Sequence, residues 1–475
     1  MGSVVKVCDA LCGSGKTSAC INMINNSTYN RLSDTGEKVE THFIFVTEFL
    51  SEVDRIVKAC RSKNFKSPKI GRDKDEYELT PTSIDTKLES LHSLLANKNN
   101  IATTHSMFSL FVQETKDLIR EGNYVLILDE TVGVVEETKL TRAEVGMLCS
   151  VNFKDLYDPD RVLNEIKRKM VSRTLVDKKD EILFFSLQSD TFGCFSEIYI
   201  LTYMFEYQPL CQFMKMWNTP YELIGVRKHN GNYEFCSIDE MDRRRDLTEK
   251  IHIYDDFKDE DIGRRKNDLS YTWYAKRAQD DDLAALSNDA VNMARYKYHA
   301  KSDEIMWTVY KQYYEKMARN GFARNFVPFN KRASNDYADK KYLIYLVNVY
   351  WRPWEQRYYK ANGVHFDSSL SDMYALSSLI QWMFRSAIRN DEEIWIYIPS
   401  KRMRLLLKRW ILNLYNGKDL MSIDFSTELR KEKAWRERKE NYETCLSMMT
   451  EVVYPPPPRT IMPMSFYKQK RSRRE

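Results

Sequence analysis

The sequence predicts an α/β protein with two domains, each built on a parallel β-sheet flanked by helices, followed by a helical or flexible C-terminal extension. Short apolar runs rich in β-branched and aromatic residues alternate with segments of helical periodicity, a pattern typical of βαβ units. The length of 475 residues is too great for one small module and accommodates two large domains. Hydrophobic residues make up 43% of the chain, which is enough apolar surface for cores of this size.

The first predicted domain covers residues 1–210. Helical segments begin at Leu50 and Met107, between the apolar runs. Crossovers between parallel strands bring the carboxyl ends of all strands to one edge of the sheet, where ligands bind. The predicted strands are the apolar runs at 4–10, 42–48, 100–106, 124–130 and 197–206.

The second predicted domain covers residues 211–411, where the alternation restarts with the runs YELIGVRKH, YEFCSI and IHIYDD. Residues 412–475 form the predicted extension, because they combine a charge-dense run, four consecutive prolines and a basic end. The other elements expected in the second domain are long helices around 281–320 and 338–362, a helix over 374–389 and a strand over 393–400.

Composition limits the environment of the protein. The mean hydropathy is −0.56, and no stretch approaches the roughly 20 apolar residues that a membrane helix needs. Charge and glycine near the N-terminus interrupt the apolar core that a signal peptide requires. The nine cysteines contain no C-x-x-C pair and do not predict a disulfide framework. We therefore expect a soluble cytoplasmic protein without a membrane partner, whose net charge of +5 is compatible with a polyanion but does not demonstrate one.

The strongest motif is ALCGSGKT at residues 10–17, between a predicted strand and a predicted helix. Glycines in such a loop let backbone N–H groups surround a phosphate. Lys16 is expected to reach the outer phosphates, and Thr17 to bind Mg²⁺. The motif predicts a site for ATP or GTP, with ATP and Mg²⁺ as the expected cofactors. Its predicted nucleotide-binding residues are Gly13, Ser14, Gly15, Lys16, Thr17 and Ser18.

A second motif, YVLILDET, places Asp129 and Glu130 at the end of an apolar strand. We expect Asp129 to hold Mg²⁺ and Glu130 to polarise the water that attacks the nucleotide. Alone, this pair would favour an acidic turn after a core strand. A phosphate loop a little over a hundred residues upstream makes the metal and base roles the better interpretation.

Small polar side chains end two further predicted strands. Thr47 follows HFIFV, and Thr103, Thr104 and His105 follow the run that begins at Asn100. Hydroxyl groups at such positions are suited to binding a sugar-phosphate backbone without reading its sequence. Helix capping is the alternative role for these residues, because threonine is a common cap.

In this order the motifs resemble those of superfamily 2 helicases, most closely the predicted DEAD/DEAH-type helicases encoded by bacteriophages and prophages. The runs FIFVTEFLSEVDRI, IATTHSMFSLF and LILDET carry the resemblance, which extends over about residues 4 to 410. It implies two RecA-like domains that bind ATP between them and single-stranded nucleic acid across their surface. It also implies that Thr202, in the position of motif III, couples the nucleotide state to nucleic-acid binding.

The second half contains two further runs that occupy the places of later helicase motifs. Residues 326–341 contain Arg332 and Asn335 in a polar loop. Within the expected helix over 374–389, the spacing of four residues places Gln381, Arg385 and Arg389 along one polar stripe. This stripe resembles motif VI and implies that Gln381 binds the nucleotide while Arg385 or Arg389 acts as an arginine finger. The alternative is the solvated face of an amphipathic helix.

The resemblance implies an ATP hydrolase that works as a nucleic-acid translocase or helicase in phage DNA replication, recombination or related metabolism, in the cytoplasm of the bacterial host. The expected partners are single-stranded or partly duplex nucleic acid, with DNA favoured over RNA, and phage replication or recombination proteins. A packaging-type motor ATPase and a nucleotide-gated binding switch stay open as alternatives. Aromatic residues at 271–274 and 342–359 are candidate platforms for bases, although helical spacing assigns most of them to the core.

Overall fold

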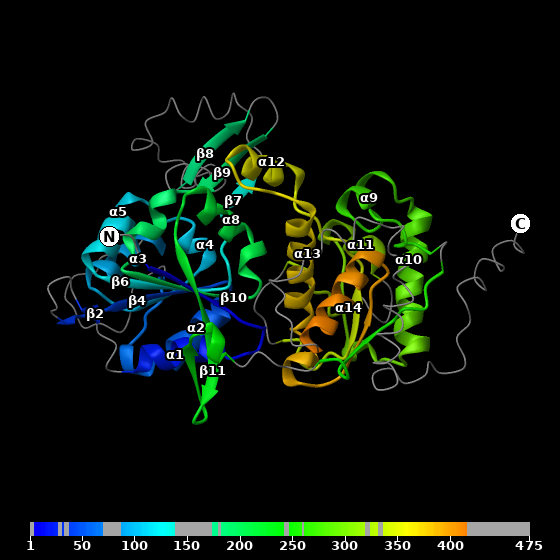
Figure 1. The fold of residues 1–475 in the computed structure, drawn as a ribbon, viewed down its shortest axis with the longest axis horizontal. Helices are drawn as coiled ribbons and strands as arrows, with labels where there is room; N and C mark the ends of the chain where they lie inside the picture. Colours follow the sequence, from blue (N-terminus) through cyan, green and yellow to red (C-terminus); the bar gives the residue numbers. More distant parts are fainter. Residues whose placement is uncertain are drawn as a thin grey trace, which may run out of the picture. The chain divides into compact units, whose positions relative to one another are not determined.

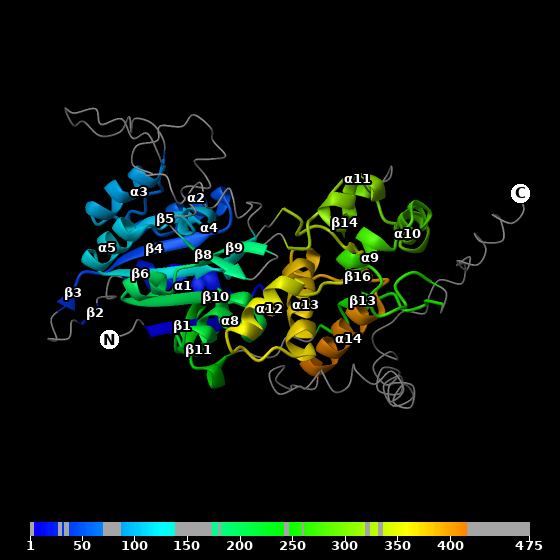
Figure 2. The same ribbon diagram turned by 90° about the horizontal axis from the view of Figure 1, so that it is seen from above.

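The protein divides into two units, residues 1–242 with 353–365 and residues 243–352 with 366–475. Ribbon views of the computed structural model are given in Figures 1 and 2. The structure describes residues 4–26, 31–32, 38–69, 87–137, 173–178, 182–241, 247–258, 261–318, 324–330 and 336–415.

The first unit is built on a seven-stranded sheet with the strand order β12-β11-β1-β10-β6-β4-β5. Neighbouring strands are parallel except in the β11–β12 hairpin, so six carboxyl ends share one edge. The strands are β1 (Val4–Asp9), β4 (His42–Thr47), β5 (Ile101–Thr104), β6 (Tyr124–Asp129), β10 (Glu197–Thr202), β11 (Tyr221–His229) and β12 (Asn232–Cys236). Two small antiparallel sheets accompany it, one of β2 (Arg31–Leu32) and β3 (Lys38–Val39), the other of β7 (Val135–Glu137), β8 (Arg173–Lys178) and β9 (Ile182–Leu187).

Helices cover both faces of the large sheet. On one face, Cys20 and Ile24 of α1 and Val53 and Ile56 of α2 pack with sheet residues such as Phe45 in one core. Figure 1 shows α4, α5 and α8 on the opposite face. The helices of this unit are α1 (Lys16–Asn25), α2 (Leu50–Ala59), α3 (Lys87–Ala96), α4 (His105–Phe108), α5 (Gln113–Glu121), α8 (Pro209–Met216) and α12 (Pro353–Ala361).

The second unit contains a four-stranded parallel sheet with the order β13-β16-β15-β14. Residues of α9, α10 and α11 pack in one core with Trp307, Ile344 and Tyr397. Figure 2 shows α13 and α14 on the other side of this sheet. Its elements are β13 (Ile251–Ile253), β14 (Ile305–Thr308), β15 (Tyr342–Tyr345), β16 (Ile394–Tyr397), α9 (Tyr271–Lys276), α10 (Asp280–Asn292), α11 (Tyr314–Met317), α13 (Ser368–Met383) and α14 (Lys401–Tyr415).

The predicted fold class is confirmed, since both units are α/β with parallel sheets flanked by helices. The division of the chain differs from the predicted boundary after residue 210, because β11 pairs with β1 and β12 pairs with β11 in the first sheet. The expected helices around 281–320 and 338–362 are interrupted by β14 and β15, whose short apolar runs do not distinguish strand from helix. Of the predicted extension, the structure describes only the last turn of α14, up to residue 415. No helix in the described part of the chain is long and apolar enough to cross a membrane.

Candidate functional site

The loop between β1 and α1 has the conformation that its glycines predict. Gly13 and Gly15 take the left-handed backbone angles φ 79° and φ 94°, which side chains with a Cβ rarely adopt. A Cβ on Gly15 would also lie 2.2 Å from the ring of Tyr233 on β12. The helix begins directly after this glycine at Lys16, so its first backbone N–H groups face the loop. Ser18 is exposed in the first turn.

Lys16 lies over this loop. Its Nζ donates hydrogen bonds to the backbone oxygens of Ala10 at 2.6 Å and Leu11 at 3.2 Å. The buried hydroxyl oxygen of Ser14 has no hydrogen-bond partner within the described part of the chain. A phosphate group would satisfy Ser14 and replace the two carbonyl oxygens as the partner of the ammonium. The residues present therefore fit the polyphosphate of a nucleotide.

Asp129, at the end of β6, contacts Thr17 of the phosphate loop. The Oγ1 of Thr17 donates to Oδ1 of Asp129 at 3.1 Å, although the two residues are 112 positions apart in the chain. Desolvation raises the pKa of the Asp129 carboxyl to about 6, and repulsion from Glu130 adds to the shift. A hydroxyl and a carboxylate oxygen are ligands suited to Mg²⁺, so this pair fits the predicted metal site.

Glu130 and Thr202 form the neighbouring pair at the same sheet edge. The Oγ1 of Thr202 donates to Oε2 of Glu130 at 3.1 Å, and the backbone N–H of Glu130 donates to Leu201 at 2.9 Å. Glu130 has the left-handed angle φ 75°, which is uncommon for a residue with a side chain. The fold thus brings together five predicted residues of the first unit: Lys16, Thr17, Asp129, Glu130 and Thr202.

The sequence reasoning missed Asp9, the last residue of β1. Its two carboxylate oxygens accept the backbone N–H groups of Met204 at 2.7 Å and Phe205 at 2.9 Å, and it pairs with Thr202 in the sheet register. Desolvation raises the pKa of the Asp9 carboxyl to about 6. Asp9 therefore fixes the turn after β10 and, through it, the position of Thr202. The sequence feature that could have identified Asp9 is its position at the end of a predicted strand, directly before the phosphate loop.

The register of β4 and β5 places Thr47 opposite Thr104. Thr47 is buried and donates to the backbone oxygen of Phe49 at 3.1 Å. The Oγ1 of Thr104 accepts the backbone N–H of Met107 at 3.4 Å and caps the short helix that begins at His105. The capping alternative thus applies to Thr104. The predicted nucleic-acid contacts of Thr47, Thr103, Thr104 and His105 stay predictions.

The expected stripe in the second unit is not present as a continuous helical face. The helix α13 ends at Met383, after which Arg385 is buried and Arg389 is exposed in a short helix over Ala387–Asn390. Because these arginines precede β16, they lie at the amino edge of the parallel sheet, not at the edge where ligands usually bind. Gln381 stays in α13, where its Nε2 donates to Ser377 at 3.5 Å. Arg332 and Asn335 lie outside the described residues.

The raised pKa of Asp129 predicts a pH-dependent gain in stability for Asp129→Asn. A carboxyl whose pKa of about 6 in the folded state exceeds its ordinary value of 3.8 binds its proton more tightly when folded. The free energy of unfolding therefore falls as the pH rises from about 4 to about 6. The Asn variant avoids this loss and keeps the acceptor for Thr17. We expect it to be more stable than wild type by about 2–3 kcal/mol at pH 8, with little difference at pH 4.

Urea unfolding of the Mg²⁺-free protein at both pH values measures this difference. Asp9→Asn is the control, because the two oxygens of Asp9 accept two N–H groups and an amide offers only one acceptor. The pKa of Asp9 is raised as well, so Asp9→Asn is spared the same pH-dependent loss, but the missing acceptor should leave it less stable at pH 8 than Asp129→Asn. A destabilised Asp129→Asn at pH 8 would contradict the raised pKa.

The first unit is thus an α/β domain whose glycine-containing loop between β1 and α1 fits a phosphate group. Residues 245–411 match the family described as the YonV C-terminal Rossmann-like domain. The SPbeta prophage-derived uncharacterized protein YonV of Bacillus subtilis (strain 168) is 34% identical over 430 residues, which cover 86% of this chain and 99% of that protein. The chain therefore belongs to the YonV family. A solved structure described as "Structure of S. tokodaii Xpd4" has 11% sequence identity and a TM-score of 0.43, over 88% of this chain and 95% of the other.

Proposed function

We propose that the protein is an ATP-dependent nucleic-acid translocase or helicase of the superfamily 2 type. The observation that carries this proposal is the pair of contacts at the carboxyl edge of the first sheet, Thr17 with Asp129 and Thr202 with Glu130. A phosphate loop alone binds nucleotide. A loop joined to a strand-end Asp-Glu pair has the groups needed for hydrolysis.

Each group has a distinct task in this proposal. Lys16 and the N–H groups at the start of α1 bind the phosphates of ATP. Thr17 and Asp129 would hold Mg²⁺, which neutralises charge on the phosphates when bound. Glu130 orients the attacking water and accepts its proton. Because Thr202 donates to Glu130, a shift of the strand end that carries Thr202 would change the position of the base.

The prophage origin of the Bacillus relative supports a role in phage nucleic-acid metabolism. Replication and recombination both require enzymes that move along or separate strands, and DNA is the proposed substrate. The motif order described above supports a motor. A packaging-type motor and a nucleotide-gated switch are the alternatives that the experiment below tests.

The test is phosphate release from ATP by the full chain with Mg²⁺, measured with and without single-stranded oligonucleotides. We expect Mg²⁺-dependent hydrolysis that single strands accelerate, together with displacement of a strand from a partly duplex substrate or of a bound protein from a single strand. Hydrolysis that ignores nucleic acid would favour the nucleotide-gated switch. Stimulation by blunt duplex alone would favour the packaging-type motor. No hydrolysis under any of these conditions would overturn the proposal.

A further inference from the structure

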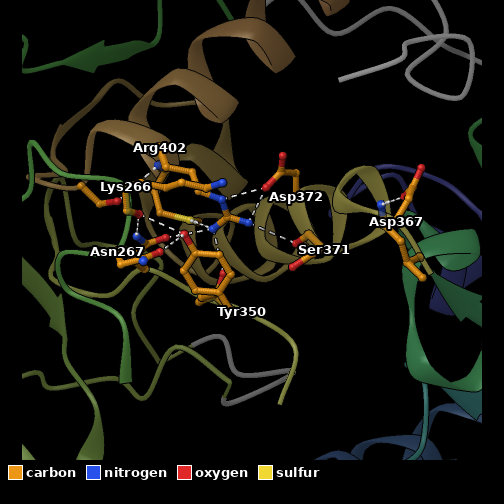
Figure 3. Close-up of polar contacts among 12 residues, drawn as sticks. Lys266, Asn267, Tyr350, Asp367, Ser371, Asp372 and Arg402 are labelled. Carbon is orange, nitrogen blue, oxygen red and sulfur yellow. Dashed lines mark hydrogen bonds and ion pairs between the residues drawn. The ribbon is translucent and has the colours of Figure 1, made fainter. Parts of the chain in front are cut away.

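A buried arginine organises the carboxyl edge of the second sheet. Arg402, the second residue of α14, donates from Nε to Oδ1 of Asp372 at 2.7 Å. Its NH1 group donates to the side-chain oxygen of Asn348 at 2.9 Å and to the backbone oxygen of Val349 at 2.8 Å. Figure 3 shows this guanidinium between Asp372 and the ring of Tyr350. The chain just after β15 is therefore held in one conformation.

The same residues hold a loop above them. The amide nitrogen of the Asn348 side chain donates to the backbone oxygens of Lys266 at 2.9 Å and Asp268 at 3.0 Å. The backbone N–H of Asn348 donates to Leu269 at 2.8 Å, and the hydroxyl of Tyr350 donates to Lys266 at 2.9 Å. Four hydrogen bonds thus fix the loop that leads into α9.

This loop ends at an exposed aromatic ring. Tyr271, the first residue of α9, is 54% exposed, and its ring lies edge-on to the ring of Tyr310 with 5.6 Å between their centres. The hydroxyl of Tyr310 in turn donates to the backbone oxygen of Asn348 at 3.1 Å. An exposed tyrosine of this kind has little freedom to lose when another flat ring stacks on it.

The chain segment that carries Tyr271 is basic. Residues 264–277 contain five basic side chains and one acidic side chain, Asp268. Asp268 is buried and accepts the backbone N–H groups of Gly263 and Arg265, each at 3.1 Å, so its charge is satisfied inside the loop. Arg265 and Lys266 are exposed on the same loop. The surface therefore combines a mounted aromatic ring with positive charge.

We propose that Tyr271, Arg265 and Lys266 form a contact surface for single-stranded nucleic acid on the second unit. An unpaired base stacks on Tyr271, while Arg265 and Lys266 bind the phosphates on either side of it. Exposed aromatic rings beside cations are the combination that binds single strands without sequence preference. The proposal rests on the proposed function and names the surface that contacts its substrate.

The test is the affinity of the full chain for fluorescent oligothymidylate and oligouridylate, measured by anisotropy without nucleotide. Tyr271→Ala should weaken binding about 5-fold to 100-fold, the effect of losing one stacked base. Tyr271→Phe should bind as wild type, because the ring is retained. The matched control is Tyr296→Ala, since Tyr296 is 66% exposed in the same unit. Thermal unfolding of each variant checks that the fold is intact.

The phosphate contacts have a separate readout. Arg265→Gln and Lys266→Gln should each reduce the slope of log affinity against log salt by about one unit, whereas Tyr271→Ala should leave this slope unchanged. Binding of either oligonucleotide that Tyr271→Ala weakens supports the proposal. The oligonucleotide that binds more tightly identifies the preferred strand as DNA or RNA. Polyglutamate that competes as well as an oligonucleotide would show general anion binding and overturn it.

Failure of this surface and failure of the proposed function give different results. Equal affinities of Tyr271→Ala and Tyr296→Ala, with strand-stimulated ATP hydrolysis intact, would overturn the surface and leave the function standing. Binding that depends on Tyr271, in a protein that does not hydrolyse ATP, would support the surface and overturn the proposed function. No binding of single strands by wild type would overturn both.

Discussion

Lys16→Ala is expected to lose nucleotide binding and ATP hydrolysis together, whereas Glu130→Gln should bind ATP but fail to hydrolyse it. The Lys16 ammonium lies inside the phosphate loop, 2.6 Å from a backbone oxygen, so its removal takes away the main positive charge of the site. A glutamine at position 130 still accepts the hydrogen bond of Thr202 but does not take a proton from water. We expect this substitution to lower the turnover number by about 10²-fold to 10⁴-fold.

Calorimetric titration with Mg²⁺-ATP and steady-state phosphate release measure the two properties separately. Glu114→Gln is the matched control, because Glu114 is an exposed glutamate on α5 of the same unit and should leave both values unchanged. Equal loss of nucleotide binding in the Lys16 and Glu130 variants would show that Glu130 holds the nucleotide and is not the base.

The candidate site of the first unit could be predicted because each of its motifs is a short continuous segment. The parallel sheet then brings the ends of these segments to one edge. The loop sequence determines the backbone of Gly13 and Gly15, and the alternation of strand and helix determines that strand ends meet at one edge. Thr17 and Asp129 are therefore in contact although 112 positions separate them. The sequence predicted that both residues lie at the metal site, and in the structure they are hydrogen-bonded.

The hairpin of β11 and β12 could not be assigned in the same way. The apolar run of β11 was assigned to the second domain because the strand-helix alternation restarts there. The sheet that a strand joins, however, depends on pairing with residues distant in the chain. Tyr221 pairs with Val5, and Tyr233 then packs against Gly15 of the phosphate loop. Spacing along the chain contains no information about that partner.

The continuous helical stripe predicted for Gln381, Arg385 and Arg389 was wrong for a related reason, while the arginine-finger role stays a prediction. The four-residue spacing of Arg385 and Arg389 assumed a helix that continues, whereas α13 ends at Met383 and the chain turns before β16. A segment that precedes a strand of a parallel sheet meets the amino edge of the sheet, whereas a helix that follows the strand begins at the carboxyl edge. By that criterion Arg402, on the helix that follows β16, lies at the carboxyl edge. Its role was visible only from its contacts with Asp372 and Asn348.

Arg402→Met is expected to destabilise the protein by about 3–5 kcal/mol, because it leaves the nearly buried carboxylate of Asp372 without its cation. Arg402→Lys should not restore the loss, since only the planar guanidinium reaches Asp372, Asn348 and Val349 at once.

Urea unfolding of the full chain at neutral pH measures the change, with Lys316→Met as the control for an exposed pair. Lys316 and Asp280 lie 3.0 Å apart but are both well exposed, so this substitution should cost less than about 1 kcal/mol. The Arg402 variant should also expose the loop at residues 264–270 to proteolysis before global unfolding, because Asn348 and Tyr350 lose their own support beneath it. A cost no larger than that of the Lys316 control would mean that Asp372 finds water or another partner, and that the loop carrying Tyr271 does not depend on the buried arginine.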